Sequence, residues 1–250
     1  MPHPNHFPPL IELEQTDSTN NYAMQLVREG MAKEGMAVLA YHQTAGKGQR
    51  SKNWLSEQSK GLNLSIVVSA DFLSPTNGFQ LLATTAVAVT DVLNRSTGQE
   101  FKIKWPNDIY RDDKKAGGIL IESVIQGTKW KWSVIGIGIN VLQERFPADL
   151  PNAISLKQIC EKDFDIKMLA ESIRKRVMDD MLRLKEEGFD QLYHAYLQRL
   201  YKLGKMVELR IDNRNQTVYI KGVSKEGLLE TGIENDVNYA FGDVEWVQKF

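Results

Sequence analysis

The sequence predicts an α+β fold, in which a mixed or antiparallel sheet is packed by helices and is followed by a small SH3-like β-barrel at the C-terminus. Three observations lead to this prediction. Strand-like segments rich in β-branched residues are joined by tight turns in the first half of the chain. Long helix-forming segments occur before, between and after them. The last stretch, of about 45 residues, contains five short strand-like segments separated by polar or glycine-containing turns. We therefore expect two domains, residues 1–202 and 203–250.

The composition limits the classes of function. The chain has 250 residues, 42% of them hydrophobic, so it can bury a substantial core. Its net charge of -1 provides no global basic field for non-specific nucleic-acid binding. Cys160 is the only cysteine, which excludes an intrachain disulfide, and the four histidines are too scattered to suggest a zinc site. No apolar run has the length of a signal peptide or a membrane helix, which predicts a cytoplasmic protein that does not bind membranes.

The first elements follow from local signals. Residues 17–30 predict a helix, because Ser18 or Thr19 can cap its first turn and a glycine follows its last apolar position. The polar start of this helix is also suited to face a ligand. Residues 37–42 form an apolar run that predicts a buried strand, and residues 62–69 carry the β-branched residues of a half-buried strand.

The middle of the chain predicts a helix and a meander. Residues 79–95 are apolar on most sides, which is typical of a helix packed flat against a sheet. Residues 101–105 then predict a strand, and the turn at Asp112 and Asp113 is expected to join two antiparallel arms. A further turn near Gly127 leads into residues 129–140, so we expect at least three strands in this meander.

The remaining elements belong to both predicted domains. Pro147 and Pro151 mark a loop, and helices are expected over residues 166–187 and from 189 to about 203, where they cover a face of the sheet. The strands expected in the C-terminal barrel are residues 206–211, 216–223, 227–231, 237–241 and 243–250.

The stretch "QTAGKGQRSKNW", residues 43–54, follows a predicted strand and holds three cations, two glycines and no acidic residue. A glycine-rich basic loop after a strand is a common place to bind a phosphate or a carboxylate, because backbone N–H groups can approach the anion. The same composition also fits a mobile surface turn that happens to be basic. This segment alone does not decide between the two interpretations.

Four further polar motifs are each ambiguous in isolation. "STN" (18–20) is most often a helix cap, "KWPND" (104–108) a strand end and turn, "KKAGG" (114–118) a hairpin exit, and "GIGIN" (136–140) a strand crowded by neighbouring backbone. Taken together with the basic loop, in this order and spacing, they closely resemble the biotin protein ligases, also called biotin–[carboxylase] ligases. The resemblance covers nearly the whole chain, including the small C-terminal domain.

The resemblance implies a role for each motif. It implies that biotin contacts Ser18, Thr19, Asn20, Gln43, Lys47, Gly48, Gln49, Lys115 and Gly118, and that the adenylate and its phosphate contact Gly46, Arg50, Lys52, Trp54 and Asn140. Short hydroxyls and amides suit a ureido ring, which offers two N–H donors and one carbonyl. In this family Trp54 would stack on adenine and Asn140 would read its edge, while Lys115 and Lys47 would neutralise developing phosphate charge. Asp108 is expected either to contact a metal ion or to orient Lys115.

The resemblance also implies a two-step reaction with ATP, biotin and Mg²⁺. The biotin carboxylate attacks the α-phosphorus of ATP, which gives biotinyl-5'-AMP and pyrophosphate, and the lysine amine of a biotin carboxyl carrier protein then attacks the mixed anhydride. The reaction needs no protein nucleophile, which agrees with the lack of a Ser/His/Asp or Cys/His constellation in the sequence. A monomer and a homodimer are both compatible with this chemistry.

Some features depart from the family pattern or leave alternatives open. The loop has Lys47, Gln49 and Ser51 where the best-known members are richer in arginine, which bears on retention of the adenylate. About 15 residues precede the "STN" motif, too few for a helix-turn-helix domain, so no specific DNA binding is expected.

A lipoate-protein ligase shares the fold and chemistry, although Gln43 and "KWPND" favour biotin. A non-catalytic module that senses biotin is the third alternative.

Overall fold

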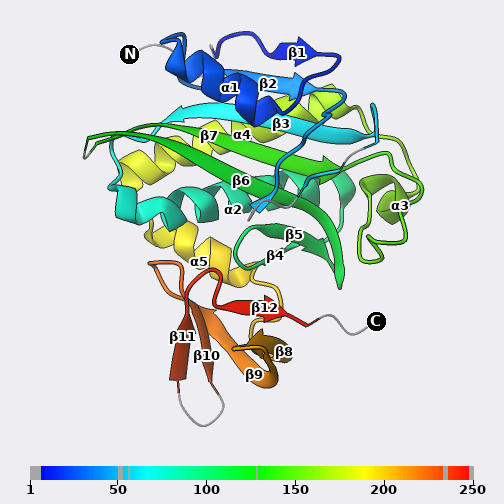
Figure 1. The fold of residues 1–250 in the computed structure, drawn as a ribbon, viewed down its shortest axis with the longest axis vertical. Helices are drawn as coiled ribbons and strands as arrows, with labels where there is room; N and C mark the ends of the chain where they lie inside the picture. Colours follow the sequence, from blue (N-terminus) through cyan, green and yellow to red (C-terminus); the bar gives the residue numbers. More distant parts are fainter. Residues whose placement is uncertain (1–6, 50–52, 56, 128, 233–235, 248–250) are drawn as a thin grey trace.

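The computed structural model describes residues 7–49, 53–55, 57–127, 129–232 and 236–247, and these form two sheets (Figure 1). The larger sheet has seven strands in the spatial order β1-β2-β3-β7-β6-β5-β4. Only β1 and β2 pair in parallel, and all other neighbours pair antiparallel, so the predicted mixed sheet is confirmed. The strands are β1 (Ile11–Leu13), β2 (Ala37–Ala40), β3 (Gly61–Ser69), β4 (Lys102–Lys104), β5 (Asp108–Arg111), β6 (Lys114–Gln126) and β7 (Lys129–Asn140).

Helices cover both faces of this sheet (Figure 1). Because side chains alternate along a strand, Val38, Val67 and Val134 all point to one face, where they pack on Ala23 and Val27 of α1. Their hydrophobic neighbours along the strands point to the opposite face and join a larger core with the other long helices. The helices are α1 (Thr19–Arg28), α2 (Gly78–Thr97), α3 (Leu156–Cys160), α4 (Ile166–Glu187) and α5 (Asp190–Gln198), with a short 3₁₀ turn at Pro75–Asn77.

The smaller sheet lies at the opposite end of the molecule from β1, below α5 (Figure 1). Its five antiparallel strands follow the order β11-β10-β9-β8-β12, as the sequence predicts for the C-terminal unit. It is tied to the rest of the chain by the hydroxyl of Tyr193, which donates to the carbonyl of Val223 at 2.8 Å, and by Nε1 of Trp105, which donates to Gly227 at 2.9 Å. The strands are β8 (Met206–Ile211), β9 (Arg214–Val223), β10 (Leu229–Gly232), β11 (Asp236–Tyr239) and β12 (Val244–Trp246).

Most predicted elements are confirmed, and α4 has the predicted bounds because Asp165 caps its start and Gly188 follows its end. The predicted last helix is too long: α5 ends at Gln198 rather than near residue 203. The backbone of residues 199–201 instead pairs with β4, since Ile103 N–H donates to Arg199 and Tyr201 N–H donates to Ile103. An unpaired edge of the sheet therefore overrides the local helical pattern.

Two short elements, besides the 3₁₀ turn at Pro75–Asn77, were not predicted. β1 has only three residues and follows a proline-rich segment, so its alternation is too brief to recognise. α3 has a reciprocal capping box, in which Ser155 and Gln158 each bond the other's backbone N–H, and the spacing "SLKQ" is a signal that would have found it. No helix in the described part of the chain is long and apolar enough to cross a membrane.

Candidate active site

The candidate site lies on the α1 face of the large sheet, where the glycines of β7 leave room above the strand. A Cβ built on Gly136 would lie 2.4 Å from Oδ1 of Asn20, and one built on Gly138 would lie 2.4 Å from Cε2 of Trp54. The sequence predicts crowding by neighbouring backbone at "GIGIN", but at these two positions the crowding comes from side chains. These glycines therefore form a floor against which two predicted site residues pack closely.

One wall of the site is an uncharged hydrogen-bond network. Oε1 of Gln43 accepts from the backbone N–H of Thr19 at 2.7 Å and from its hydroxyl at 3.1 Å. Nε2 of Gln43 donates to Oδ1 of Asn63 at 3.3 Å, and Asn63 is held by the carbonyl of Ala40. Ser18 occupies the N-cap position of α1, but its side chain makes no capping hydrogen bond. The structure thus brings Thr19 and Gln43 together, although 24 residues separate them in the sequence.

Asn20 is held from two sides by residues that sequence reasoning missed. The hydroxyl of Ser65 donates to Oδ1 of Asn20 at 2.6 Å, and Nδ2 of Asn20 donates to Glu122 at 2.8 Å. Glu122 also forms a 3.4 Å ion pair with Lys47 of the basic loop. Ser65 and Glu122 lie inside predicted strands, so only the register of the sheet reveals that they face the site.

Lys115 and Asp108 form the charged part of the site. Nζ of Lys115 lies 2.5 Å from Oδ1 of Asp108. The side chain of Lys115 is 36% exposed, so solvent or a ligand can reach the ammonium group. A Cβ on Gly118 would lie 3.6 Å from this Nζ, which shows that the glycine leaves space beside the cation. Of the two roles expected for Asp108, contact with Lys115 is the one seen in this geometry.

Asn140 is buried at the end of β7 and faces the backbone around Lys115. Its Nδ2 lies 3.4 Å from the carbonyl of Lys115 and 3.3 Å from that of Ile154. The backbone N–H of Lys115 donates to Asn152 at 2.6 Å, and Ile154 donates back to Lys115 at 2.9 Å. These bonds fix the strand that carries Lys115 against the loop after β7.

The described part of the basic loop folds back on the floor of the site. The backbone N–H of Trp54 donates to Gly46 at 2.9 Å, and Nε1 of its indole donates to Oδ1 of Asn63 at 3.0 Å. Lys47, Gly48 and Glu122 are among the residues that line a hollow of about 280 Å³, and Gln49 is half-buried. Arg50, Ser51 and Lys52 lie outside the described residues.

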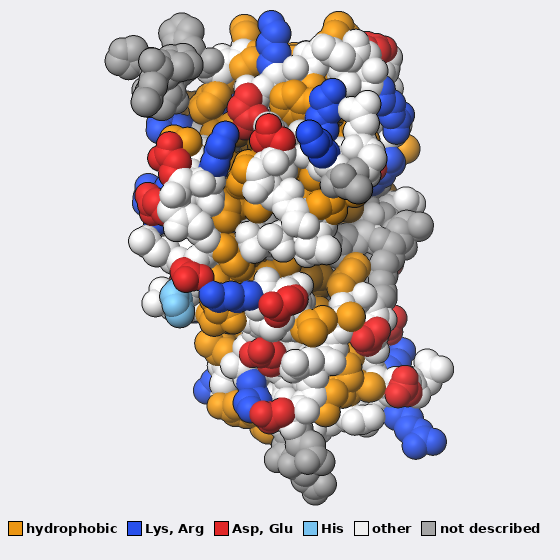
Figure 2. All heavy atoms as spheres, turned by 90° about the vertical axis from the view of Figure 1, so that its left-hand side faces the viewer, with side chains coloured by type: hydrophobic (Ala, Val, Ile, Leu, Met, Phe, Trp, Pro, Cys, Tyr) orange, Lys and Arg blue, Asp and Glu red, His pale blue; other side chains and the backbone are white. Residues whose placement is uncertain are grey.

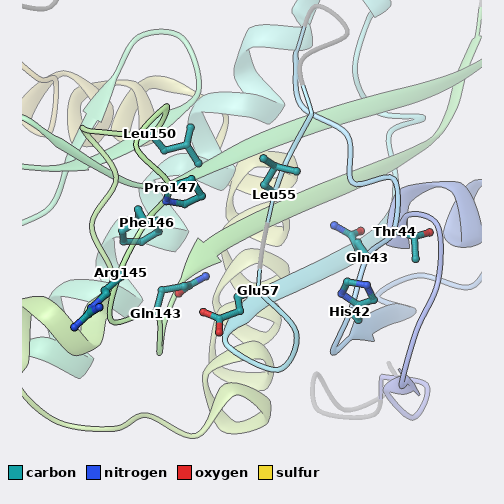
Figure 3. A pocket seen from close by; sticks show the side chains of 10 residues that line it. All are labelled: His42, Gln43, Thr44, Leu55, Glu57, Gln143, Arg145, Phe146, Pro147 and Leu150. Atoms are coloured by element: carbon teal, nitrogen blue, oxygen red, sulfur yellow. The ribbon is translucent and has the colours of Figure 1, made fainter.

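A larger hollow, of about 700 Å³, lies next to this network and was not predicted (Figure 3). It separates the segment after β2, which carries Gln43, from the loop after β7, which carries Gln143. Its lining residues are His42, Gln43, Thr44, Leu55, Glu57, Gln143, Arg145, Phe146, Pro147 and Leu150. Within the described residues, no cluster of three or more His, Cys, Asp or Glu side chains could hold a metal ion.

Lys104 of the "KWPND" motif is buried below the site, at the junction with the C-terminal unit. Its Nζ lies 3.1 Å from the hydroxyl of Tyr110 and over the rings of Tyr110 and Trp246, at 4.6 and 5.1 Å from their centroids. Burial lowers the pKa of Lys104 to about 8, and the neighbouring charge of Asp108 opposes this shift.

Comparisons with known proteins agree with this fold. A biotin protein ligase from Aquifex aeolicus, solved in complex with biotin and ATP, is 29% identical to this chain, with a TM-score of 0.82 over 97% of this chain and all of that one. The bifunctional ligase/repressor BirA of Bacillus subtilis is 35% identical over 88% of this chain and 68% of its own length. The biotin–[acetyl-CoA-carboxylase] ligase of Paracoccus denitrificans is 27% identical over 87% and 91%.

The fold is thus that of the biotin protein ligases. The family model described as "Biotin/lipoate A/B protein ligase family" matches residues 12–140, from β1 to the end of β7. The chain belongs to this family.

Proposed function

We propose that the chain activates biotin with ATP and transfers it to a lysine of a biotin carboxyl carrier protein. One observation carries this proposal: an uncharged network of Thr19, Gln43 and Asn63 lies on the same glycine-floored face as the Lys115–Asp108 pair. The substrate has an uncharged head group, which needs neutral hydrogen-bond donors and acceptors. Its carboxylate is activated at the other end, which needs a nearby cation. Membership in the ligase family and the likeness to a relative solved with biotin and ATP support it.

The network around Gln43 is suited to a ureido ring. Hydroxyls and carboxamides can both donate and accept, whereas a charged group would pay a larger desolvation cost on burial. We assign Ser18, Thr19, Asn20 and Gln43 to contact with the ring, and hydrogen bonds to Ser65 and Glu122 hold the Asn20 side chain in place. Gly48 and Gln49 of the loop and Gly118 complete the proposed biotin contacts.

The first step forms a bond between a biotin carboxylate oxygen and the α-phosphorus of ATP and breaks the bond to pyrophosphate. Negative charge develops on the phosphoryl oxygens, and Lys115 is positioned to neutralise it, with Lys47 as a second cation. Arg50 and Lys52 are proposed for the same anion on the strength of the sequence alone. We take Mg²⁺ as part of the nucleotide substrate, MgATP, because such ions are held mainly by phosphates and one or two carboxylates.

In the second step the neutral amine of the carrier lysine attacks the acyl carbon of the mixed anhydride, AMP leaves with the electron pair, and the amine loses a proton. The Lys115 side chain is 36% exposed, and we propose that the carrier amine approaches from this side. We further propose a domain boundary near residue 202, a cytoplasmic location, and a carrier belonging to a carboxylase.

A competition assay tests the substrate and the class of activity together. The chain is incubated with biotin, an excess of lipoate, MgATP and a carrier domain, with a carrier variant lacking the acceptor lysine as control. We expect biotin on the native carrier, with lipoate unable to displace it, because the polar network of Gln43 suits a ureido ring better than a dithiolane. Attachment of lipoate would indicate the lipoate ligase alternative, and biotin binding without pyrophosphate release would indicate a sensing module.

A further inference from the structure

Glu122 joins a cation of the basic loop to the head-group side of the proposed biotin site. Its Oε2 accepts from Nδ2 of Asn20 at 2.8 Å, and its Oε1 pairs with Nζ of Lys47 at 3.4 Å. Glu122 lies on β6, whereas Asn20 belongs to α1 and Lys47 to the basic loop. One carboxylate therefore contacts two residues that are proposed to bind the ligand.

The carboxamide of Asn20 has two ends of nearly the same shape, and its partners decide where each end points. Asn20 is only 3% exposed, so these partners lie within the protein. The hydroxyl of Ser65 donates to Oδ1 at 2.6 Å, but it could also accept from an NH₂ group and donate to the hydroxyl of Thr19, 2.8 Å away. The ionised carboxylate of Glu122 can only accept, so it requires the NH₂ end. Of these two partners, Glu122 is therefore the one that distinguishes the orientations of Asn20.

The orientation of Asn20 matters because its oxygen lies at the floor of the site. A Cβ built on Gly136 would meet Oδ1 of Asn20 before any other atom. A carbonyl oxygen can accept two hydrogen bonds, and Ser65 supplies one of them. The second can come from a ring N–H of a ureido head group, which offers two such donors. The opposite orientation would place an NH₂ group at the floor, where it would oppose the donors of the ring.

Lys47 makes the chemical nature of Glu122 decisive. An ammonium group only donates, so it requires an oxygen at the side chain it contacts. In Glu122→Gln, the remaining oxygen would face Lys47 and the new NH₂ group would face Asn20. Asn20 would then have to turn its oxygen toward position 122 and away from the floor. The native carboxylate satisfies both donors at once, because each of its oxygens accepts from one of them.

We propose that Glu122 is a positioning residue that keeps the oxygen of Asn20 at the floor of the site and so sets the affinity for a head group with N–H donors. Glu122 acts through Asn20 and does not itself contact the ligand. The inference rests on the proposed function, because it takes biotin as the ligand of this site. It narrows the substrate class to acids whose head group carries N–H donors, such as a cyclic urea.

Calorimetric titration with biotin, without nucleotide or carrier, tests the inference. Glu122→Gln should weaken the affinity by about tenfold or more, because a hydrogen bond to the ring is lost and two donors are opposed. Glu12→Gln is the matched control on β1. The carboxylate of Glu12 likewise joins a lysine, Lys167 at 2.7 Å, and a neutral donor, the hydroxyl of Tyr41 at 2.9 Å. Glu12→Gln should bind biotin like the native chain.

A swapped pair separates the orientation of Asn20 from a general loss of structure. Asn20→Asp alone should bind weakly, because its new carboxylate would face that of Glu122. When Glu122→Gln is added, the NH₂ group introduced at position 122 can donate to the carboxylate introduced at position 20, whose other oxygen stays at the floor. The double variant should therefore bind biotin at least about fivefold more tightly than either single variant, since the two residues act as a pair. Loss of the ion pair with Lys47, or of stability, would not be repaired in this way.

The outcomes separate this inference from the proposed function. If the native chain binds no biotin, the proposed function fails, and the inference fails with it. If the native chain binds biotin and Glu122→Gln binds it equally well, the inference is overturned while the function stands. The same holds if the double variant binds no more tightly than the single variants. Circular dichroism checks the fold of each variant. Should Glu122→Gln not fold, the comparison of Asn20→Asp with the double variant decides, and no gain in affinity overturns the inference.

Discussion

At the scale of single residues, the Lys115–Asp108 pair is the charged centre of the site. The pair is partly exposed, so the two charges attract one another only modestly in water, and an incoming phosphate can compete for the cation. Asp108 thus holds the ammonium in place without neutralising it permanently. Lys114, the residue before it, is exposed and provides a natural comparison because it carries the same charge one position away.

Lys115→Ala should lose biotin-dependent pyrophosphate exchange by about two or more decades in rate, because a cation that stabilises transition-state charge is removed. Lys114→Ala should retain near-native exchange. Both variants should keep the native circular dichroism spectrum. Near-native exchange by Lys115→Ala would show that another group neutralises the phosphate.

Gly136→Ala should lower the affinity for biotin by about tenfold or more, since the new Cβ would meet the carboxamide of Asn20 and break its bonds to Ser65 and Glu122. Titration calorimetry with biotin measures this effect. Gly78→Ala at the start of α2, where a Cβ meets no atom closer than 3.9 Å, should bind biotin like the native chain. Native affinity in Gly136→Ala would mean that the position of Asn20 does not affect the biotin site.

The chemistry of the candidate site could be predicted at the residue scale only in part. Thr19 and Gln43 stand in motifs at element ends, where polar residues are conspicuous. Ser65 and Glu122 are polar residues within strands, and their role depends on a register that pairs β3 and β6 with β7. Gln143 lies in a loop, and nothing in its sequence context signals that its side chain is buried without partners.

At the scale of elements, the β4–β5 hairpin connects the site to the C-terminal unit. Lys104 and Asp108 are paired across this hairpin, and Nζ of Lys104 is enclosed by Tyr110, Tyr201 and Trp246 of β12. The aromatic rings and Asp108 compensate in part for burying the ammonium group.

The lowered pKa of Lys104 predicts a specific pH dependence of stability. In the folded chain Lys104 loses its proton near pH 8, whereas in the unfolded chain it does so near its ordinary value of about 10.4. Between these values the unfolded state binds more protons, so the contribution of Lys104 to the free energy of unfolding rises with pH. The difference in unfolding free energy between the native chain and Lys104→Met should therefore shift in favour of the native chain from pH 8 to pH 10.

Urea denaturation of both proteins at several pH values measures this shift. Subtracting the two curves of unfolding free energy against pH removes the contributions of the titratable groups that both proteins share, including the charged neighbours of Lys104, which are Asp108, Asp113, Lys115 and Lys202. Lys102→Met, on the same strand but paired with exposed Glu100, is the control and should show no such trend. A difference for Lys104→Met that does not change with pH would contradict the lowered pKa.

The elements themselves were mostly predictable because local signals and packing agree. α4 starts at an aspartate cap and ends before a glycine, so its bounds follow from the sequence. Residues 199–201 have helical composition but pair with the edge of β4, and only the tertiary structure reveals this competition. The glycines of β7 appear as a motif in the sequence, but which side chains occupy the space above them depends on how α1 and the basic loop pack.

At the scale of the whole molecule, charges of both signs are mixed. Figure 2 shows acidic and basic side chains interspersed among apolar ones over the described part of one face, and the net charge of the chain is -1. We therefore predict no sequence-specific DNA binding by this chain at physiological salt, with or without biotin. A gel-shift assay with promoter fragments tests this, and a complex that resists salt would contradict it.

The division of the reaction into two steps is the central claim, and isolating the intermediate tests it most directly. The chain is incubated with biotin and ATP labelled at the α-phosphate, without a carrier, and free nucleotide is then removed. We predict labelled biotinyl-5'-AMP bound to the protein, and on addition of a carrier domain we predict release of labelled AMP in step with biotin attachment, with no further ATP. Failure to form the adenylate, or label attached covalently to the chain itself, would contradict the account.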